Sequence, residues 1–253
     1  MLGLSVIIIT HNEEEVILRC LESVKPVADE IVVVDSFSTD RTADLCRESG
    51  CRVIQRDFDG YGKQKQFAVD LALNDWIFSV DADEVVSAEL QREILLKKKD
   101  AGCWMLDAGF RIPFSLCYMG RIMKYSGVGK EYHLRVFNRN RGSFTTVPVH
   151  EGIEVEGSIG VMKGKMVHYS YRGISHHLEK INTYTSQAAE GYCNRGKSFS
   201  KTWAYLKFPG SFISLYFVKL GLLDGYPGFI WSFLGAVYST LKVAKTIELS
   251  KKP

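Results

Sequence analysis

Closely spaced cysteines are absent from this chain. Its six cysteines are scattered, and no two of them are separated by only two residues. That spacing excludes the common zinc-binding pattern, and it is too sparse for a disulfide framework. We therefore expect reduced thiols and a cytosolic protein.

Long hydrophobic runs are absent as well. The first apolar run, Leu4 to Ile9, has no basic segment before it and leads into the polar residues His11 to Glu15, which does not fit a signal peptide. No later stretch reaches the roughly 20 uninterrupted apolar residues of a membrane-spanning helix. From the sequence we expect neither export nor a transmembrane helix.

A strong excess of one charge is also missing from the chain as a whole. Its formal net charge is only +3, and no nucleic-acid reading motif is present, so nucleic acid is a poor candidate partner. The charge is uneven, however. Residues 192–253 contain nine lysines and arginines against two acidic residues, which makes the C-terminal part clearly basic.

The first hundred residues alternate between buried strands and amphipathic helices. The expected strands are Leu4–Ile9, Ile31–Val34, Arg52–Ile54 and Trp76–Val80. The expected helices are Glu13–Val24, Arg41–Ser49, Gln64–Asn74 and Glu89–Lys99. This alternation is typical of βαβ units, so we expect an α/β fold with a mostly parallel, Rossmann-like sheet flanked by helices.

The rest of the chain changes character twice. From Trp104 to Val167 short strands and glycine-rich loops predict an α+β half, with one strand at Val147–Val149. Leu178–Asn194 has helical spacing. Trp203–Leu241 is rich in aromatic and apolar residues, but lysines and Gly/Pro breaks interrupt it. Broken apolar helices with interleaved lysines favour a position on a bilayer surface.

Polar residues follow three of the expected strands. They are Thr10 to Asn12, Asp35, and Asp81 to Asp83. Because ligands bind at the carboxyl ends of parallel strands, these residues are expected to line one crevice. Two carboxylates two residues apart, such as Asp81 and Asp83, suit Mg²⁺ or Mn²⁺ together with substrate phosphates.

The other strand-end residues have two possible roles. Asp35 can accept from a base N–H or a ribose hydroxyl, or it can be a turn residue. Thr10 and Asn12 are placed to meet a nucleoside. Glu13 is expected near them, although Glu13 to Glu15 also suit the first turn of a helix, where negative charge is favourable.

Four segments in this order resemble the motifs of glycosyltransferase family 2: Val6–Glu13, Ile31–Asp40, Gly62–Gln66 and Phe78–Glu84. Members of that family are inverting enzymes with a GT-A-type fold. The resemblance implies a GT-A-type catalytic domain at 1–190, with a nucleotide-sugar half (1–100) and an acceptor half (101–190). A helical, membrane-associating extension is then expected at 191–253.

Three later segments resemble a narrower branch, the β-1,4-glucosyltransferases of lipopolysaccharide core biosynthesis: Val147–Glu151, Val167–Tyr171 and Asp224–Gly228. This branch acts on inner-core heptose. The resemblance therefore implies transfer of glucose from UDP-glucose to a lipid-linked heptose. A polyprenyl phosphate or a protein is the alternative acceptor, and a non-catalytic nucleotide-sugar-binding scaffold is the alternative class.

The resemblance also implies roles for single residues. Thr10 and Asp35 would hold the uridine, Asp81 and the neighbouring Ala82 would lie near the ribose, and Asp83 would bind the metal. Lys65 stands where the family usually has an arginine near the base and phosphates, and Gln66 replaces the usual asparagine.

An inverting transfer also needs a base in the second half of the chain. Glu151 is our candidate, with His150 orienting the acceptor. Glu151 could instead pair with Arg139 or Arg141 in a surface loop, and His150 could itself be the base, since its ordinary pKa of about 6.5 suits neutral pH.

Three further histidines could have either a metal-binding or a structural role. His168 either completes the metal shell, as a late histidine does in several GT-A-type enzymes, or is structural. His176 and His177 are adjacent on an expected helix, so their side chains point apart and we expect both to face solvent.

The basic, aromatic tail is expected to bind an anionic membrane surface. The lysines interleaved with its aromatic residues are Lys201, Lys207, Lys219, Lys242 and Lys245, and each is expected to contribute ~1 kcal/mol to that attraction. The alternative is a core or a dimer interface, so a homo-oligomer is possible. The expected location is the cytoplasm, peripherally on the inner face of the cell membrane.

Overall fold

The computed structural model describes residues 2–100, 104, 106–129, 131–145 and 152–250. They form two compact units. One comprises Met1–Phe114 and Glu131–His168, and the other comprises Ser115–Lys130 and Tyr169–Pro253. The division after residue 168 lies upstream of the 190/191 boundary expected from the sequence, which falls inside a helix.

A parallel sheet begins the first unit. Its strands are β1 (Leu4–Thr10), β2 (Glu30–Asp35), β3 (Arg52–Gln55) and β4 (Trp76–Asp81), in the order β3-β2-β1-β4. In this register Thr10 lies opposite Asp35, and Ile9 lies opposite Asp81. The polar residues at the three strand ends therefore share one edge of the sheet, as expected.

Antiparallel strands extend the sheet beyond β4. They are β8 (Tyr132–Asn138), β6 (Gly109–Tyr118), β12 (Met166–His168) and β5 (Glu84–Val86). Two short strands also pair with β6: β7 (Arg121–Ile122) in antiparallel and β11 (Ile159–Val161) in parallel. A separate hairpin joins β9 (Gly142–Phe144) to β10 (Ile153–Val155). The sheet is therefore mixed. The strand expected at 147–149 lies outside the described residues.

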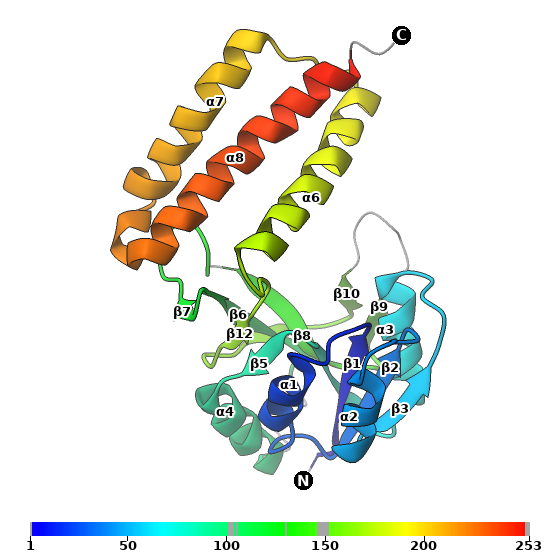
Figure 1. The fold of residues 1–253 in the computed structure, drawn as a ribbon. Coiled ribbons are helices and arrows are strands. Elements are labelled where there is room, and N and C mark those ends of the chain that lie inside the picture. The colour runs from blue at the N-terminus through cyan, green and yellow to red at the C-terminus, as the bar shows by residue number, and fades with distance from the viewer. Residues whose placement is uncertain (1, 101–103, 105, 130, 146–151, 251–253) are drawn as a thin grey trace. The chain divides into compact units, whose positions relative to one another are not determined.

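Helices cover both faces of the parallel strands (Figure 1). They are α1 (Ile17–Val24), α2 (Thr42–Glu48), α3 (Tyr61–Leu71) and α4 (Ala88–Lys99). Alternate residues of a strand point to opposite faces. Ile8 accordingly packs in a core with residues of α1, α2 and α4, whereas Ile7 packs in a second core with residues of α3.

Burial on both faces explains why β1, β2 and β4 are mostly apolar. Each fully buried isoleucine or valine contributes about 1.5–3 kcal/mol, so the paired cores hold the strand ends in place. The helices on both faces confirm the expected α/β class.

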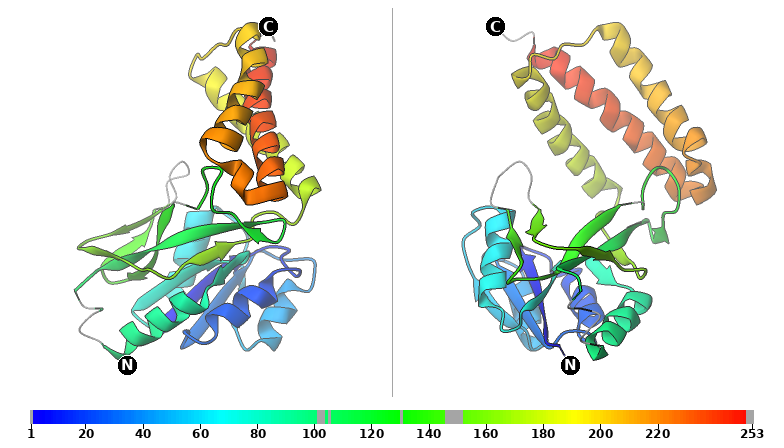
Figure 2. Two further views of the ribbon diagram at one scale, coloured as in Figure 1. Left: turned by 90° about the vertical axis from the view of Figure 1, so that its left-hand side faces the viewer. Right: turned by 180° about the vertical axis from the view of Figure 1, so that it is seen from behind.

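Helices dominate the second unit. They are α6 (Ile174–Asn194), α7 (Lys201–Ile213), the π-helical turn η1 (Ser214–Val218), the 3-10 turn η2 (Gly221–Asp224) and α8 (Gly225–Leu249). Within this unit α8 lies between α6 and α7 and contacts both (Figures 1 and 2). The expected Gly/Pro interruptions fall at Pro209, which lies inside α7, and at the start of α8.

None of the described helices alone is both long enough and apolar enough to cross a membrane. Lys201–Val218 and Gly221–Leu249 reach the required length and apolar composition only as a pair, and the pair bends by 67° at its break.

A buried carboxylate lies just after this break. Asp224 is 1% exposed and accepts hydrogen bonds from the backbone N–H groups of Lys124 (3.1 Å) and Tyr125 (2.9 Å). Asp224 therefore anchors the start of α8 to the 123–126 segment of the same unit.

Candidate functional site

Asp81, the last residue of β4, is held between two cations. Its Oδ1 lies 2.6 Å from Nζ of Lys65 on α3, and its Oδ2 accepts from the guanidinium of Arg135 on β8 at 2.9 Å. Arg135 also bonds to Glu84 at 2.5 Å, and Glu84 accepts from the Asp81 backbone N–H at 2.9 Å. Elements far apart in the sequence thus converge on one carboxylate.

The charges set the protonation of this cluster. Burial by itself would raise the pKa of Asp81, but the charges of Arg135 and Lys65 outweigh burial and hold that pKa below its ordinary value. Glu84 is more deeply buried, and burial raises its pKa above the ordinary value despite the charge of Arg135. Asp81 is therefore the carboxylate that stays ionised.

Asp83 faces a histidine. Its Oδ2 lies 3.1 Å from Nε2 of His168, and the β12–β5 register places His168 opposite Glu84. Burial lowers the pKa of His168, but the hydrogen bond and charge of Asp83 outweigh burial, so the net shift is upward. The structure thus brings together the two residues that the sequence assigned to a metal.

Asp83 and His168 fit a metal site only in part. Among the described residues no group of three or more His, Cys, Asp or Glu side chains is arranged to hold an ion. Mg²⁺ and Mn²⁺, however, commonly bind one or two carboxylates and take their other ligands from substrate phosphates and water. The oxygen of Asp83 and the nitrogen of His168 are compatible with that kind of incomplete site.

Asp35 is fully buried and organises the turn after β2. It accepts from the N–H (3.0 Å) and hydroxyl (2.5 Å) of Ser38, and the Gln55 amide lies 3.4 Å away. The alternative role as a turn residue is therefore present in the structure. A carboxylate can accept more bonds than these, so a role in binding a nucleotide stays a prediction.

Thr10 and Asn12 lie at the end of β1, beside Asp35. The Thr10 hydroxyl is buried and has no hydrogen-bond partner among the described residues. Asn12 adopts a left-handed backbone (φ 55°), and its amide oxygen accepts from the Thr39 backbone N–H at 2.8 Å. An unsatisfied buried hydroxyl is costly, which makes Thr10 a good point of contact for a ligand.

The expected helical position of Glu13 to Glu15 is wrong, because α1 begins only at Ile17. The three glutamates lie in the turn before it, and the Glu13 carbonyl accepts the first N–H groups at Val16 (3.0 Å) and Ile17 (2.9 Å). Ala82 is buried between the two aspartates.

His150 and Glu151 lie outside the described residues. The β9–β10 hairpin flanks them, and the Thr145 N–H donates to the Gly152 carbonyl at 2.8 Å. Arg139, a possible partner of Glu151, donates to the backbone carbonyls of Val69 and Ala72.

Arg135 and the burial of Glu84 were not expected from the sequence. A signal was present, because Arg135 stands between the apolar residues Leu134 and Val136 of β8. An arginine there needs a carboxylate partner, and Asp81 and Glu84 provide it.

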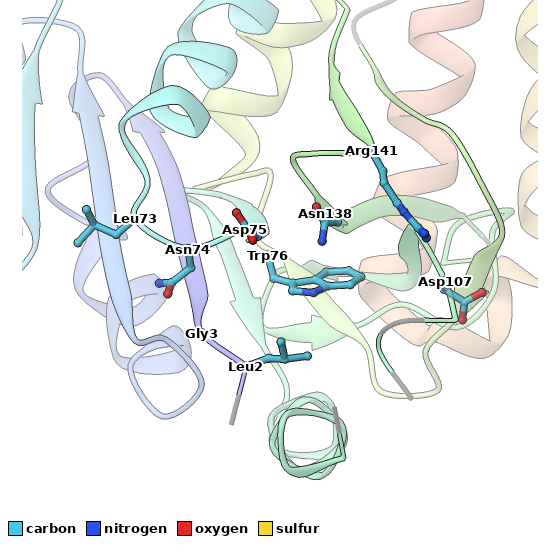
Figure 3. A pocket seen from close by; sticks show the side chains of 9 residues that line it. All are labelled: Leu2, Gly3, Leu73, Asn74, Asp75, Trp76, Asp107, Asn138 and Arg141. Atoms are coloured by element: carbon cyan, nitrogen blue, oxygen red, sulfur yellow. The ribbon is translucent and has the colours of Figure 1, made fainter. Parts of the chain in front are cut away.

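A cavity at the opposite sheet edge is not part of this cluster. It has a volume of about 480 Å³ and lies at the amino ends of β1 and β4, where Gly3, Asn74 and Arg141 line it (Figure 3). Ligands of parallel sheets bind at the carboxyl ends instead.

Comparison with known proteins gives a consistent result. The model of glycosyl transferase family 2 matches residues 5–111. The lipopolysaccharide core biosynthesis glycosyltransferase LpsC of Rhizobium meliloti is 34% identical, over 98% of this chain and 93% of that protein. An uncharacterized glycosyltransferase of Rickettsia typhi is 31% identical, over the whole of this chain and 89% of its own length.

Among solved structures, Staphylococcus aureus TarS 1–349 in complex with UDP-GlcNAc resembles this chain over 98% of its length and 89% of TarS, with a TM-score of 0.51 and 17% identity. At that identity the likeness concerns the fold, and it agrees with the GT-A-type architecture expected from the sequence.

Proposed function

Because the chain belongs to glycosyltransferase family 2, we propose that it transfers glucose from UDP-glucose, with inversion, onto a heptose of a lipid-linked lipopolysaccharide inner core. The observation that carries this proposal is the carboxylate group at the end of β4, where Lys65 and Arg135 hold Asp81 and where Asp83 faces His168. The resemblance to LpsC supports the acceptor class.

The donor is proposed to lie across the carboxyl ends of β1, β2 and β4. Thr10 and Asp35 contact the uridine, with Asn12 and Glu13 beside them. Asp81 meets the ribose, and Lys65, already 2.6 Å from Asp81, places a positive charge near the phosphates. Arg135 keeps Asp81 ionised and fixed in orientation.

A divalent ion is proposed to complete the donor site. Asp83 and His168 would hold Mg²⁺ or Mn²⁺, and the ion, when bound, neutralises the charge of the leaving diphosphate. The protein supplies the fixed pair, because strand pairing between β5 and β12 sets the position of His168.

The acceptor half of the reaction needs a base. Glu151 is proposed to take the proton from the acceptor hydroxyl while that oxygen attacks the anomeric carbon. The attack comes from the face opposite the diphosphate, a new C–O bond forms, and the bond to the UDP oxygen breaks. His150 orients the acceptor or replaces Glu151 as the base.

The second unit is proposed to bind an anionic bilayer peripherally, on the cytoplasmic face. Trp203 is 47% exposed, Tyr205 is 78% exposed and Val218 is 73% exposed. Lys201 and Lys207 lie on the same helix as the two aromatic residues. Exposed apolar side chains combined with lysines are the features that favour a lipid surface with negative charge.

The test is a transfer assay that follows UDP release from UDP-glucose, with and without a saccharide acceptor that ends in heptose. Asp83→Ala and Glu151→Gln should both abolish turnover. A Glu151→Gln protein of normal activity would reject the assignment of the base. It would favour a polyprenyl phosphate acceptor, which is already ionised and needs no base.

Absence of transfer and hydrolysis with every divalent ion and acceptor, a protein acceptor included, would favour the non-catalytic scaffold. The similarity to LpsC over 98% of this chain argues against that alternative, because LpsC is named as a glycosyltransferase.

A further inference from the structure

A cavity in the second unit has no part in the proposed donor site. Its volume is about 290 Å³, and residues of α6, α8 and the segments 126–128 and 215–219 line it. The aromatic residues that line it are Tyr171, His177, Tyr184, Trp231 and Tyr238. Figures 1 and 2 show α6 and α8 running side by side.

Ring packing holds one wall of this cavity. The rings of Tyr171 and His177 lie 4.1 Å apart, and Trp231 lies 5.6 Å from Tyr171 and 5.4 Å from His177. The imidazole Nδ1 of His177 is 2.9 Å from the Tyr118 hydroxyl. Three packed rings and a hydrogen bond fix the wall before any ligand arrives.

The charge of the lining is positive. Two lysines, Lys180 and Lys219, and no carboxylate line the cavity in the part of the chain that the structure describes. His177 adds no charge near neutral pH, because burial first, and then the charge of Lys180, lowers its pKa to about 4. The expectation that His177 faces solvent is therefore wrong, since α6 turns it inward.

Lys180 is held by two contacts, and Lys219 is exposed beside Gly127. Nζ of Lys180 donates to the Ser170 carbonyl at 2.8 Å and lies 5.3 Å from the centre of the Tyr171 ring. The side chain of Lys219 runs beside Gly127, where a Cβ would approach its Cδ and Nζ to 2.8 and 2.9 Å. Gly127 also has a φ of +78°, so glycine leaves the room that Lys219 occupies.

An unsatisfied hydroxyl completes the lining. Ser126 is 1% exposed, and its Oγ has no hydrogen-bond partner among the described residues. Its backbone N–H donates to the Lys219 carbonyl at 2.8 Å, which ties the two together. The lining thus offers hydroxyl donors and ammonium donors without a competing carboxylate.

We propose that this cavity binds a phosphate group carried on a head group of about monosaccharide size. Lysine binds phosphate as a point charge, and aromatic walls supply the apolar contacts of small-molecule sites. Its volume lies at the lower end of ligand pockets, which limits the head group to about one sugar ring.

The phosphate can belong to a phosphorylated saccharide or to a phospholipid. Phosphate binding by the cavity does not depend on the proposed function. Identifying a bound saccharide as the acceptor does rest on the proposed function.

The first test is calorimetric titration with glucose 6-phosphate, with glucose as the uncharged control. The wild type should bind the phosphorylated sugar and not glucose. A double variant, Lys180→Met with Lys219→Met, should weaken binding at least tenfold, and Lys219→Arg should restore part of it. Lys197→Met removes an exposed lysine of the same unit, outside the cavity, and should change nothing.

Equal binding of glucose and glucose 6-phosphate would overturn the proposal. So would a double variant that binds like the wild type. Gly127→Ala is a second test variant that keeps both positive charges. It should also weaken binding, because the added Cβ crowds the side chain of Lys219.

Binding to lipid vesicles distinguishes the two possible sources of the phosphate group. If the double variant loses binding to phosphatidylglycerol vesicles in proportion to its loss of glucose 6-phosphate, the phosphate is that of a lipid. If it loses only the sugar phosphate, the ligand is a phosphorylated saccharide. A double variant that loses neither kind of binding would overturn the proposal. Stabilisation by UDP-glucose should persist in the double variant, so failure here is separable from failure of the donor site.

Discussion

Nζ of Lys65 lies 2.6 Å from Oδ1 of Asp81, so a lysine from α3 neutralises one side of the carboxylate that ends β4. Arg135 neutralises the other side from β8, at 2.9 Å. The carboxylate is therefore held between two cations and stays ionised. The pair is an interaction that a bound donor can extend, because Lys65 retains further donor hydrogens.

Replacing Lys65 should damage donor binding rather than folding. Lys65→Met should raise the KM for UDP-glucose at least tenfold, because the positive charge near the phosphates is lost. Lys65→Arg should stay closer to the wild type, since it keeps the charge. The matched control is Lys63→Met, two residues earlier in α3 and near Asp59 at 4.0 Å, which should leave KM unchanged.

Arg135 should matter for stability. Arg135→Met leaves Glu84 without its cationic partner and Asp81 with Lys65 alone, and breaking such a buried pair costs about 3–5 kcal/mol. Urea unfolding should show a loss of that size. Arg41→Met is the control, because its pair with Glu48 is exposed and worth about 1 kcal/mol or less. Equal losses for the two variants would contradict the account.

Asp224 should stabilise the second unit rather than act in chemistry. Asp224→Ala removes the acceptor for the N–H groups of Lys124 and Tyr125, and we expect a loss of about 2–3 kcal/mol. Thermal unfolding followed by circular dichroism measures it. Thermal stabilisation by UDP-glucose and Mn²⁺ should remain at temperatures where the variant is folded, and its complete loss would place Asp224 in the donor site.

His177 should make stability depend on pH. Burial lowers its pKa to about 4 in the folded protein, against about 6.5 in the unfolded chain, so the unfolded chain binds the extra proton between those values. Its contribution is complete above pH 6.5 and falls away as the pH drops toward 4. Across that window the unfolding midpoint of the wild type should fall more steeply than that of His177→Asn. Parallel slopes would contradict the assignment.

Vesicle binding should depend on the exposed side chains of α7 and η1. Tyr205→Ser combined with Val218→Ser should reduce co-sedimentation with phosphatidylglycerol vesicles severalfold, because two largely exposed apolar side chains are lost. Phosphatidylcholine vesicles should bind the wild type more weakly. A variant that binds vesicles normally but changes from dimer to monomer would point to a second copy of the chain as the occupant of this surface.

The parallel half of the fold could be predicted because local patterns determine it. The apolar runs around Ile7, Val33 and Phe78 are buried on both faces, which few other structures allow. Helix starts were less predictable, since α1 begins at Ile17 rather than Glu13 and α6 at Ile174 rather than Leu178. Before α1, the Glu13 N–H donates to the Thr42 hydroxyl at 2.8 Å, a contact between residues far apart in the chain that helical spacing does not reveal.

The grouping of Thr10, Asp35 and Asp81 at one edge of the sheet could be predicted from their positions at strand ends, whereas the ion-pair network could not. Asp81 and Asp83 stand directly after β4, and topology alone places them. Arg135 reaches Asp81 from 54 residues away, across an antiparallel pairing that no local signal specifies. The inward turn of His177 likewise depends on how α6 packs within its unit, which spacing along the helix does not determine.

The most direct measurement of the central claim is calorimetric titration of UDP-glucose, with and without Mn²⁺ or Mg²⁺, on the wild type and on Asp83→Ala. Asp44→Ala, an exposed carboxylate on α2, is the matched control. The account predicts metal-dependent binding in the wild type and the control, and its loss in Asp83→Ala. Absence of binding by any nucleotide sugar under every metal condition would contradict a donor site at the end of β4.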